Sequence, residues 1–167
     1  MFDANPISAL RRESDYFDAT VEGEGEFNPF ADRGWKTIAR QFSHMLPLQH
    51  GARLLDVGCG TGQSRKLYID KCETYTGLDI SLRALDLARD KFPESSWVHG
   101  DASQMPFADE QFDIVALSSV LHHIKDFAKV ACEAFRVLRP GGYAFAFDPN
   151  LLHPAMALFR HPRSIMY

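Results

Sequence analysis

Short apolar runs alternate with longer stretches of mixed polarity along most of this chain. Four runs are rich in aliphatic and aromatic residues, as buried strands are, and they lie near residues 54–57, 75–80, 96–99 and 112–117. The stretches 63–70 and 82–91 between them have the pattern of helices, and Ser81 is a good N-cap for the second. This alternation predicts right-handed crossovers and a parallel sheet.

The clearest helix in the sequence follows the fourth of these strands. Apolar residues recur there with helical spacing, at Phe127, Val130, Ala131, Ala134, Phe135 and Leu138. Pro140-Gly141-Gly142 should end this helix, and a fifth strand is expected over Tyr143–Phe147. Cys132 falls inside the helical pattern and is expected in the core. The fold class that we predict is a doubly wound, mainly parallel α/β sandwich.

A glycine-rich turn follows the first strand, in the segment Leu54–Gly62. Gly58, Gly60 and Gly62 alternate with other residues there, and glycine allows positive φ and close approach of a ligand to bare backbone. The N–H groups of a following helix would point back at this loop. Strand, glycine loop and helix in succession are how an α/β sheet forms a nucleotide crevice.

Two acidic residues follow the next two strands. Asp79 lies 17 residues after Gly62, near the distance at which an acid of this fold accepts the ribose hydroxyls. Asp101 comes after the third strand, where its carboxylate could accept a bond from an exocyclic adenine amine. Each acid alone could equally be a surface carboxylate or a helix cap. Their succession at the ends of parallel strands favours a nucleoside site.

On these residues the sequence resembles the class I S-adenosylmethionine-dependent methyltransferases, particularly the branch that acts on small molecules. The matching segments are LLDVGCGTG (54–62), TGLDIS (76–81), GDASQMPFADEQFDIV (100–115), LHHI (121–124) and RVLRPGGYAFAFDPN (136–150). The resemblance implies S-adenosylmethionine as cofactor and a small-molecule methyl acceptor as substrate. It also implies that Asp56 orients the methionyl ammonium, Asp79 the ribose and Asp101 the adenine. The full set of expected cofactor-binding residues is Asp56, Gly58, Cys59, Gly60, Gly62, Asp79, Ile80, Asp101, Ala102 and Ser118.

Two other functions stay open at this point. A nicotinamide-dependent dehydrogenase would share the fold, but its G-x-G-x-x-G spacing is not met, because the third glycine comes one residue early. Asp56 would also place a negative charge close to any pyrophosphate. The other alternative is a non-catalytic module that binds S-adenosylmethionine or a partner.

His122 and His123 follow the fourth strand and are the candidate catalytic residues. Histidine is a suitable general base near neutral pH for an acceptor that must lose a proton. The alternative is that one of them only caps the loop or contacts the cofactor by shape alone, and we favour it because adjacent residues rarely point in the same direction. Ser118-Ser119-Val120-Leu121 stands where many amino-group methyltransferases have an Asn-Pro-Pro-Tyr-like tetrad. This lowers the expectation of nucleic-acid bases or protein amides as acceptors.

Charge and composition narrow the range of partners. The 167 residues carry a net charge of −4 with a pI near 5.9, and no basic stripe is present for a nucleic acid. No apolar run approaches the ~18 residues of a membrane span, and the first residues do not resemble a signal peptide. Cys59, Cys72 and Cys132 form no metal motif with the histidines, so no metal is expected. We expect a cytoplasmic protein with reduced thiols.

Three regions are expected along the chain. Residues 1–50 should form a helical cover segment, with an amphipathic helix over Trp35–Met45, before the cofactor-binding core of 51–150. A partly helical tail is expected over 151–167, without strands six and seven of the family's sheet. The fifth strand would then be an exposed edge, which a homo-oligomer, further chain or a short helix over Pro154–Phe159 could cover.

Overall fold

Five parallel strands form the single sheet of the computed structural model, which describes residues 6–24, 37 and 51–148. In space the strands follow the order β3-β2-β1-β4-β5, and every neighbouring pair is parallel. Their bounds are β1 (Arg53–Val57), β2 (Thr74–Asp79), β3 (Ser96–His99), β4 (Phe112–Ser118) and β5 (Leu138–Phe147). The order reverses between β1 and β4, so a crevice opens where their carboxyl ends diverge. The predicted parallel α/β fold is confirmed.

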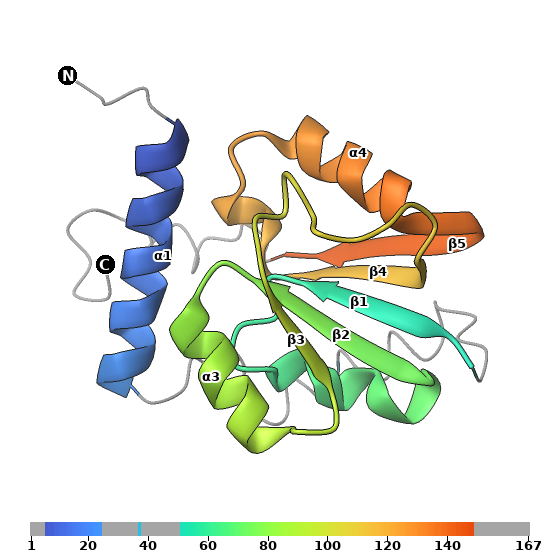
Figure 1. Ribbon diagram of the computed structural model, residues 1–167, viewed down its shortest axis with the longest axis horizontal. Helices are drawn as coiled ribbons and strands as arrows, with labels where there is room; N and C mark the ends of the chain where they lie inside the picture. Colours follow the sequence, from blue (N-terminus) through green and yellow to red (C-terminus); the bar gives the residue numbers. More distant parts are fainter. Residues whose placement is uncertain (1–5, 25–36, 38–50, 149–167) are drawn as a thin grey trace.

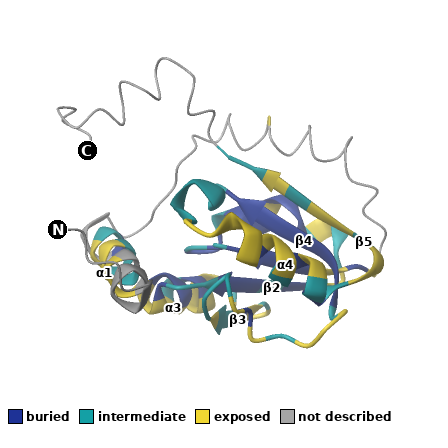
Figure 2. Cartoon of the chain, turned by 90° about the horizontal axis from the view of Figure 1, so that it is seen from above, coloured by how far each residue is buried: buried dark blue, intermediate teal, exposed yellow. Residues whose placement is uncertain are grey.

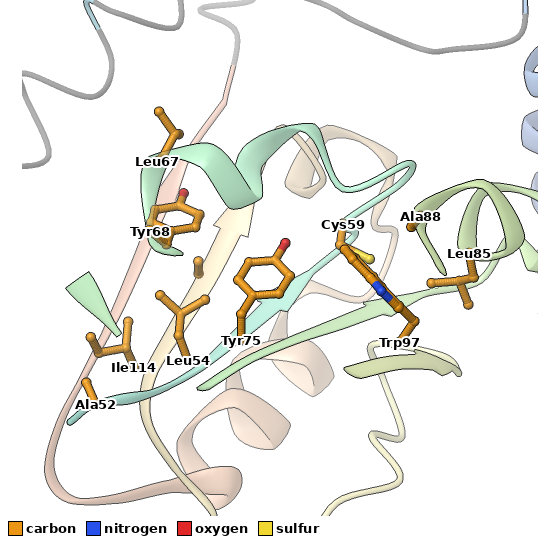
Figure 3. Close-up of a cluster of buried hydrophobic side chains, with 11 residues drawn as sticks. Ala52, Leu54, Cys59, Leu67, Tyr68, Tyr75, Leu85, Ala88, Trp97 and Ile114 are labelled. Atoms are coloured by element: carbon orange, nitrogen blue, oxygen red, sulfur yellow. The ribbon is translucent and has the colours of Figure 1, made fainter. Parts of the chain in front are cut away.

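One face of the sheet is covered by α3 (Leu82–Lys91) and by two 3-10 turns, η1 (Gln63–Leu67) and η2 (Ile69–Lys71). Tyr68, Tyr75 and Trp97 are the large side chains of this face (Figure 3), and the rings of Tyr75 and Trp97 meet edge to face with centroids 5.6 Å apart. The predicted helix at 82–91 is confirmed, and the Ser81 hydroxyl caps it by accepting from Ala84 N. The helix predicted over 63–70 is instead the two 3-10 turns, which direct the Ser64 and Leu67 side chains inward.

The opposite face is covered by α4 (Phe127–Val137), which lies against β1 and β4 through Val130, Ala134 and Val137. Asp126 caps α4 by accepting from Lys129 N. Aliphatic side chains of three neighbouring strands complete this half of the core, among them Leu55, Val57, Leu78, Val115 and Leu117.

The apolar pattern of α4 is broader than the surface that it buries. Phe127 is 55% exposed and Phe135 is 82% exposed, and Ala131 is exposed as well. Cys132, which we expected in the core, is also exposed. The reason is geometric: the sheet contacts only the α4 side that carries Val130, Ala134 and Val137, and no other described element covers the rest (Figure 2).

Strand β5 begins five residues before the predicted start at Tyr143. Its register against β4 is irregular near Phe112, and Gly141 has a φ of +78° within the Pro140–Gly142 segment. β5 lies at the edge of the described sheet, with Tyr143 51% exposed and both Ala144 and Ala146 exposed.

Residues 1–50 were expected to form a helical cover segment, but the sequence pattern did not single out the long helix α1 (Pro6–Glu24), which lies beside α3 at the carboxyl ends of the strands (Figure 1). Ser14 Oγ donates to the Ile80 carbonyl at 3.0 Å, and the Asp18 carboxylate accepts from the Ser81 hydroxyl. These bonds attach α1 to the loop after β2, at the mouth of the crevice.

Two predicted helices fall largely outside the described residues. Of the segment Trp35–Met45 only Thr37 is described, with helical backbone, and Pro154–Phe159 lies entirely outside. Among the helices of the described part, none has the length and apolar character that crossing a bilayer requires.

Candidate functional site

A cavity of about 360 Å³ opens at the carboxyl ends of the strands, between the glycine loop, the loops after β2, β3 and β4, and α1. It is lined by eight of the ten residues expected to bind cofactor, namely Gly58, Cys59, Gly60, Asp79, Ile80, Asp101, Ala102 and Ser118. Asp56 and Gly62 are not among its lining residues. The sequence therefore located this site through residues that are up to 60 positions apart.

The glycine loop passes over the end of β1 with positive φ at Gly58 (+73°) and Gly60 (+51°). The N–H groups of Gly58 and Cys59 donate to the Leu78 carbonyl, which ties the loop to β2. A Cβ added at Gly60 would meet no atom within 4 Å, because this position faces open space. Gly60 is thus the point of the loop where a ligand can approach the backbone.

Gly62 has a different role from the one we expected. Its φ is +79°, and an added Cβ would lie 2.6 Å from Trp97 Cη2 and 3.2 Å from Phe92 Cδ2. The residue therefore packs against the aromatic side chains of the core instead of lining the cavity. The spacing of the glycines could not separate contact with a ligand from close packing.

Asp79 joins two loops at the wall of the cavity. Its Oδ2 accepts from Gly60 N at 2.7 Å, and its Oδ1 accepts from Ser81 N at 2.9 Å. Burial raises the pKa of this carboxyl, while hydrogen bonds from the Ser81 and Gly60 backbone oppose the rise. A carboxylate with further lone pairs at this point could accept hydroxyl donors of a sugar.

Asp101 lies farther along the same wall, after β3. Its carboxylate accepts from Ser103 N at 2.8 Å and from Ser103 Oγ at 2.7 Å, which fixes its orientation. Ile80 and Ala102 line the cavity from the same two loops. An apolar surface between two oriented carboxylates is a suitable environment for a nucleoside, whose base needs both stacking and hydrogen bonding.

Asp56 is fully buried behind the loop. Its Oδ2 accepts from Tyr75 OH at 2.6 Å and from the Ser64 hydroxyl, while Oδ1 has no hydrogen-bond partner among the described residues. Burial raises its pKa to about 6, against the lowering effect of these hydroxyl donors. Asp56 thus lies close behind the cavity, with one acceptor atom still available.

The Cys59 side chain points away from the loop toward the core (Figure 3). A Cβ on Gly77 would lie 2.6 Å from Cys59 Sγ, so the thiol packs against β2. Burial and the nearby carboxylates of Asp79 and Asp56 raise the pKa of this thiol. A neutral, buried thiol is not a nucleophile, so the Cys59 side chain is not a candidate catalytic group.

The two adjacent histidines separate in the structure. His123, at the end of the 3-10 turn η3 (Leu121–His123), lines the cavity, whereas His122 does not. His122 Nδ1 instead pairs with Asp148 Oδ1 at 2.5 Å, at the end of β5. Of the two candidate bases, His123 is thus the one placed to meet a ligand.

Sequence reasoning expected a cover segment over residues 1–50 but did not identify the α1 residues that line the cavity. Phe17 and Val21 reach the cavity from this helix, and the Phe17 ring meets the His123 ring edge to face, with centroids 5.1 Å apart. Sequence reasoning also missed Asp148. Its position directly after the last strand was the one sequence signal that could have pointed to the site. Within the described ranges no cluster of His, Cys, Asp or Glu could hold a metal ion.

Comparison with known proteins gives a consistent result. Residues 55–146 match the sequence model of a family described as a methyltransferase domain. The chain is 32% identical over 136 residues to the 2-phytyl-1,4-naphtoquinone methyltransferase of Thermosynechococcus vestitus, covering 78% of this chain and 55% of that protein. The chain spans about half the length of the curated relatives it matches.

Two solved structures share the fold. An S-adenosylmethionine-dependent methyltransferase from Mesorhizobium loti aligns with a TM-score of 0.58 and 28% identity, over 64% of this chain and 51% of that one. The [4+2]-cyclase SpnF aligns with a TM-score of 0.62 and 28% identity, over 67% and 44%. None of these three proteins is named as a dehydrogenase, the remote alternative that the sequence left open.

Proposed function

Because the chain belongs to the methyltransferase domain family, with S-adenosylmethionine as cofactor, we propose that it transfers a methyl group to an apolar small molecule. The observation that carries this proposal is a cavity lined by two unlike groups of residues. One group, which we call the cofactor wall, contains Gly60, Asp79 and Asp101, and the other, the acceptor wall, contains Phe17, Val120 and His123. A cofactor bound by the first group would lie in the same cavity as an acceptor bound by the second.

The residues of the cofactor wall are suited to S-adenosylmethionine. When bound, S-adenosylmethionine supplies a methyl group on a cationic sulfur, which a nucleophile can displace. Asp79 and Asp101 would hold the ribose and the adenine, and Ile80 and Ala102 would contact the base. Asp56, with its available Oδ1, would act on the methionyl ammonium from behind the loop. These carboxylates also favour a cationic ligand over a phosphate.

The acceptor wall is suited to an apolar, ring-shaped acceptor. Phe17 and Val21 from α1 and Val120 and Ile124 from the loop after β4 give this wall four apolar side chains, beside the charged residues Lys125, Asp126 and Lys129. Such a surface binds a lipophilic molecule by excluding water from it. A relative named for a naphthoquinone substrate supports this class of acceptor.

His123 would act as the general base. A hydroxyl acceptor becomes a better nucleophile when its proton is removed during attack, and imidazole is suited to this near neutral pH. The protein's larger contribution would be positional, because displacement requires the acceptor atom to lie in line with the bond that breaks. His123 lines the cavity, so it could both remove the proton and help to position the acceptor.

The test is methyl transfer to 1,4-naphthoquinol, the reduced form of 1,4-naphthoquinone, by the purified chain and two variants. His123→Ala should lower turnover by about 10²–10⁴-fold with unchanged affinity for S-adenosylhomocysteine, as expected for loss of a base. His123→Phe keeps a ring against Phe17 but accepts no proton, so it should be equally impaired. Full activity in His123→Phe would show that the ring only shapes the pocket.

A second function is favoured by one observation, the exposed edge at β5. The residues proposed to bind the cofactor all lie in the described part of the chain, but no described element covers the far side of β5. A chain of this kind could bind S-adenosylmethionine without transferring its methyl group, and the structural neighbour SpnF is named for cyclisation and not for methylation. Tight cofactor binding with no transfer to any probe would support this alternative.

A further inference from the structure

We infer that Asp148 is a positioning residue, which holds the η3 turn so that His123 faces the cavity. The inference rests on the proposed role of His123 and concerns a residue that the sequence did not single out. Asp148 follows β5 and does not line the cavity, so it would act through its neighbours.

The Asp148 carboxylate makes three hydrogen bonds to η3, 26 residues away along the chain. Oδ2 accepts from Leu121 N at 3.2 Å, and Oδ1 accepts from His122 N at 3.2 Å and pairs with His122 Nδ1 at 2.5 Å. Both side chains are largely enclosed, with exposed fractions of 20% for Asp148 and 16% for His122. A partly buried, charge-assisted contact of this kind is stronger and better defined than a surface pair.

These bonds do the work of a helix cap. A 3-10 turn leaves its first N–H groups without partners inside the turn, and Val120 at its start provides no side-chain acceptor. The Asp148 carboxylate, brought in from another strand, accepts from two of these N–H groups. Without it, these two N–H groups would lose their acceptor, and the turn would be held by the bond from Ser119 N to the Phe147 carbonyl and by the packing of Leu121 on the core.

The same contact fixes the ring of His123. The His122 ring, held at Nδ1 by Asp148, lies with its centroid 4.0 Å from that of His123, at an angle of 45°. The His123 ring also meets the Phe17 ring, edge to face. His123 is therefore in contact with a ring tied to β5 and with a ring on α1. Asp148 holds one of these two rings, that of His122, in place.

The inference can be tested by nuclear magnetic resonance without any acceptor. The His122 Nδ1 proton bound to Asp148 should give a slowly exchanging downfield signal, which Asp148→Ala should abolish. The His123 ring signals should move in the same variant, because the ring beside them is released. The control Asp70→Asn, at an exposed carboxylate, should leave all of these signals in place. A persisting His122 signal in Asp148→Ala, or His123 signals that do not move, would overturn the inference.

Turnover of 1,4-naphthoquinol gives the second measurement. Asp148→Ala should lower kcat by about 10–100-fold, since misplacing a catalytic group by 1 Å can cost up to ~10²-fold. KM for the cofactor should change less than twofold, and Asp148→Glu should restore part of kcat. An Asp148→Ala variant that loses the signal yet keeps full kcat would also overturn the inference. If the parent chain methylates no probe while the signals respond as expected, the proposed function fails and the positioning role stands.

Discussion

The two ends of the cavity are built in different ways. At the glycine loop, Asp56, Asp79 and Asp101 are held by hydrogen bonds from residues no more than about 20 positions away, and most of the surrounding side chains are buried. At the β5 end, support comes from distant parts of the chain, and α4 and β5 leave large apolar groups exposed. Within the described residues, the proposed cofactor wall is thus held by nearby parts of the chain, whereas the proposed acceptor wall depends on distant ones.

This difference follows from how local the contacts are that build each end. The matched regions of this chain correspond to 52% and 55% of the length of two curated relatives. Local segments can specify a cofactor wall because each strand and the loop after it place one ligand-facing group. An acceptor wall draws on α1, η3 and β5 together, so it depends on long-range contacts. We therefore expect changes at the glycine loop to be the more severe.

The largest expected effect separates two glycines of that loop. Gly62→Ala should destabilise the fold by roughly 2–5 kcal/mol, because positive φ and a contact with Trp97 both oppose the new methyl group. Gly60→Ala shares the positive φ but meets open space, so it should cost only about 1–2 kcal/mol. Urea unfolding of both variants measures the difference.

Cofactor affinity should rank these two variants differently. The Gly60→Ala methyl group enters the cavity and should weaken S-adenosylhomocysteine binding at least about tenfold, or roughly 1.4 kcal/mol. Gly62→Ala, where folded, should bind nearly normally. Equal unfolding free energies for the two would contradict the packing role of Gly62. Normal binding by Gly60→Ala would mean that the loop is only a turn.

The next largest effect concerns the charge buried behind the loop. The pKa of Asp56 is raised from 3.8 to about 6 by burial, so the folded protein holds this proton more tightly than the unfolded chain. The resulting stabilisation is complete below pH ~4 and is lost as pH rises through ~6. Asp56→Asn should abolish this slope and be up to ~3 kcal/mol more stable than the parent at pH 7. Unfolding in urea at pH 4 and pH 7 tests this.

Asp113 is the matched control for this experiment. It is also a buried strand aspartate, but hydrogen bonds and charge from Arg53, with Arg139, outweigh its burial and lower its pKa. Asp113→Asn should therefore destabilise the protein at neutral pH. If Asp56→Asn proves less stable than the parent at pH 7, the hydrogen bonds from Ser64 and Tyr75 outweigh the cost of the buried charge. A gain in stability with loss of cofactor binding would mark Asp56 as kept for function.

The features that the sequence predicts are mainly those that nearby parts of the chain build, and the features that it misses depend on distant contacts. The strands, the Ser81 cap, and Asp79 and Asp101 were predictable because each leaves a local signature in the chain. The contribution of Phe17 was not, because an apolar residue on a helix carries no sign of what it faces. Asp148 was missed for a similar reason, since its partner His122 lies 26 residues away and the pairing depends on β5 lying beside β4. The packing role of Gly62 could be recognised only from the structure, which places Trp97 against it.

The smallest expected effect is on α4, which leaves large apolar groups exposed as β5 does. Phe135 is 82% exposed, so Phe135→Ser should change the free energy of unfolding by no more than about 0.5 kcal/mol. Val130→Ala, on the buried side of the same helix, removes methyl groups from the core and should cost roughly 1–3 kcal/mol. A loss at Phe135 as large as that at Val130 would contradict an open α4 surface and would show that this side is covered in solution. In a longer chain that supplies such a cover, the cost of Phe135→Ser should rise while that of Val130→Ala stays the same. The ratio of the two costs therefore measures how complete the β5 end of the molecule is.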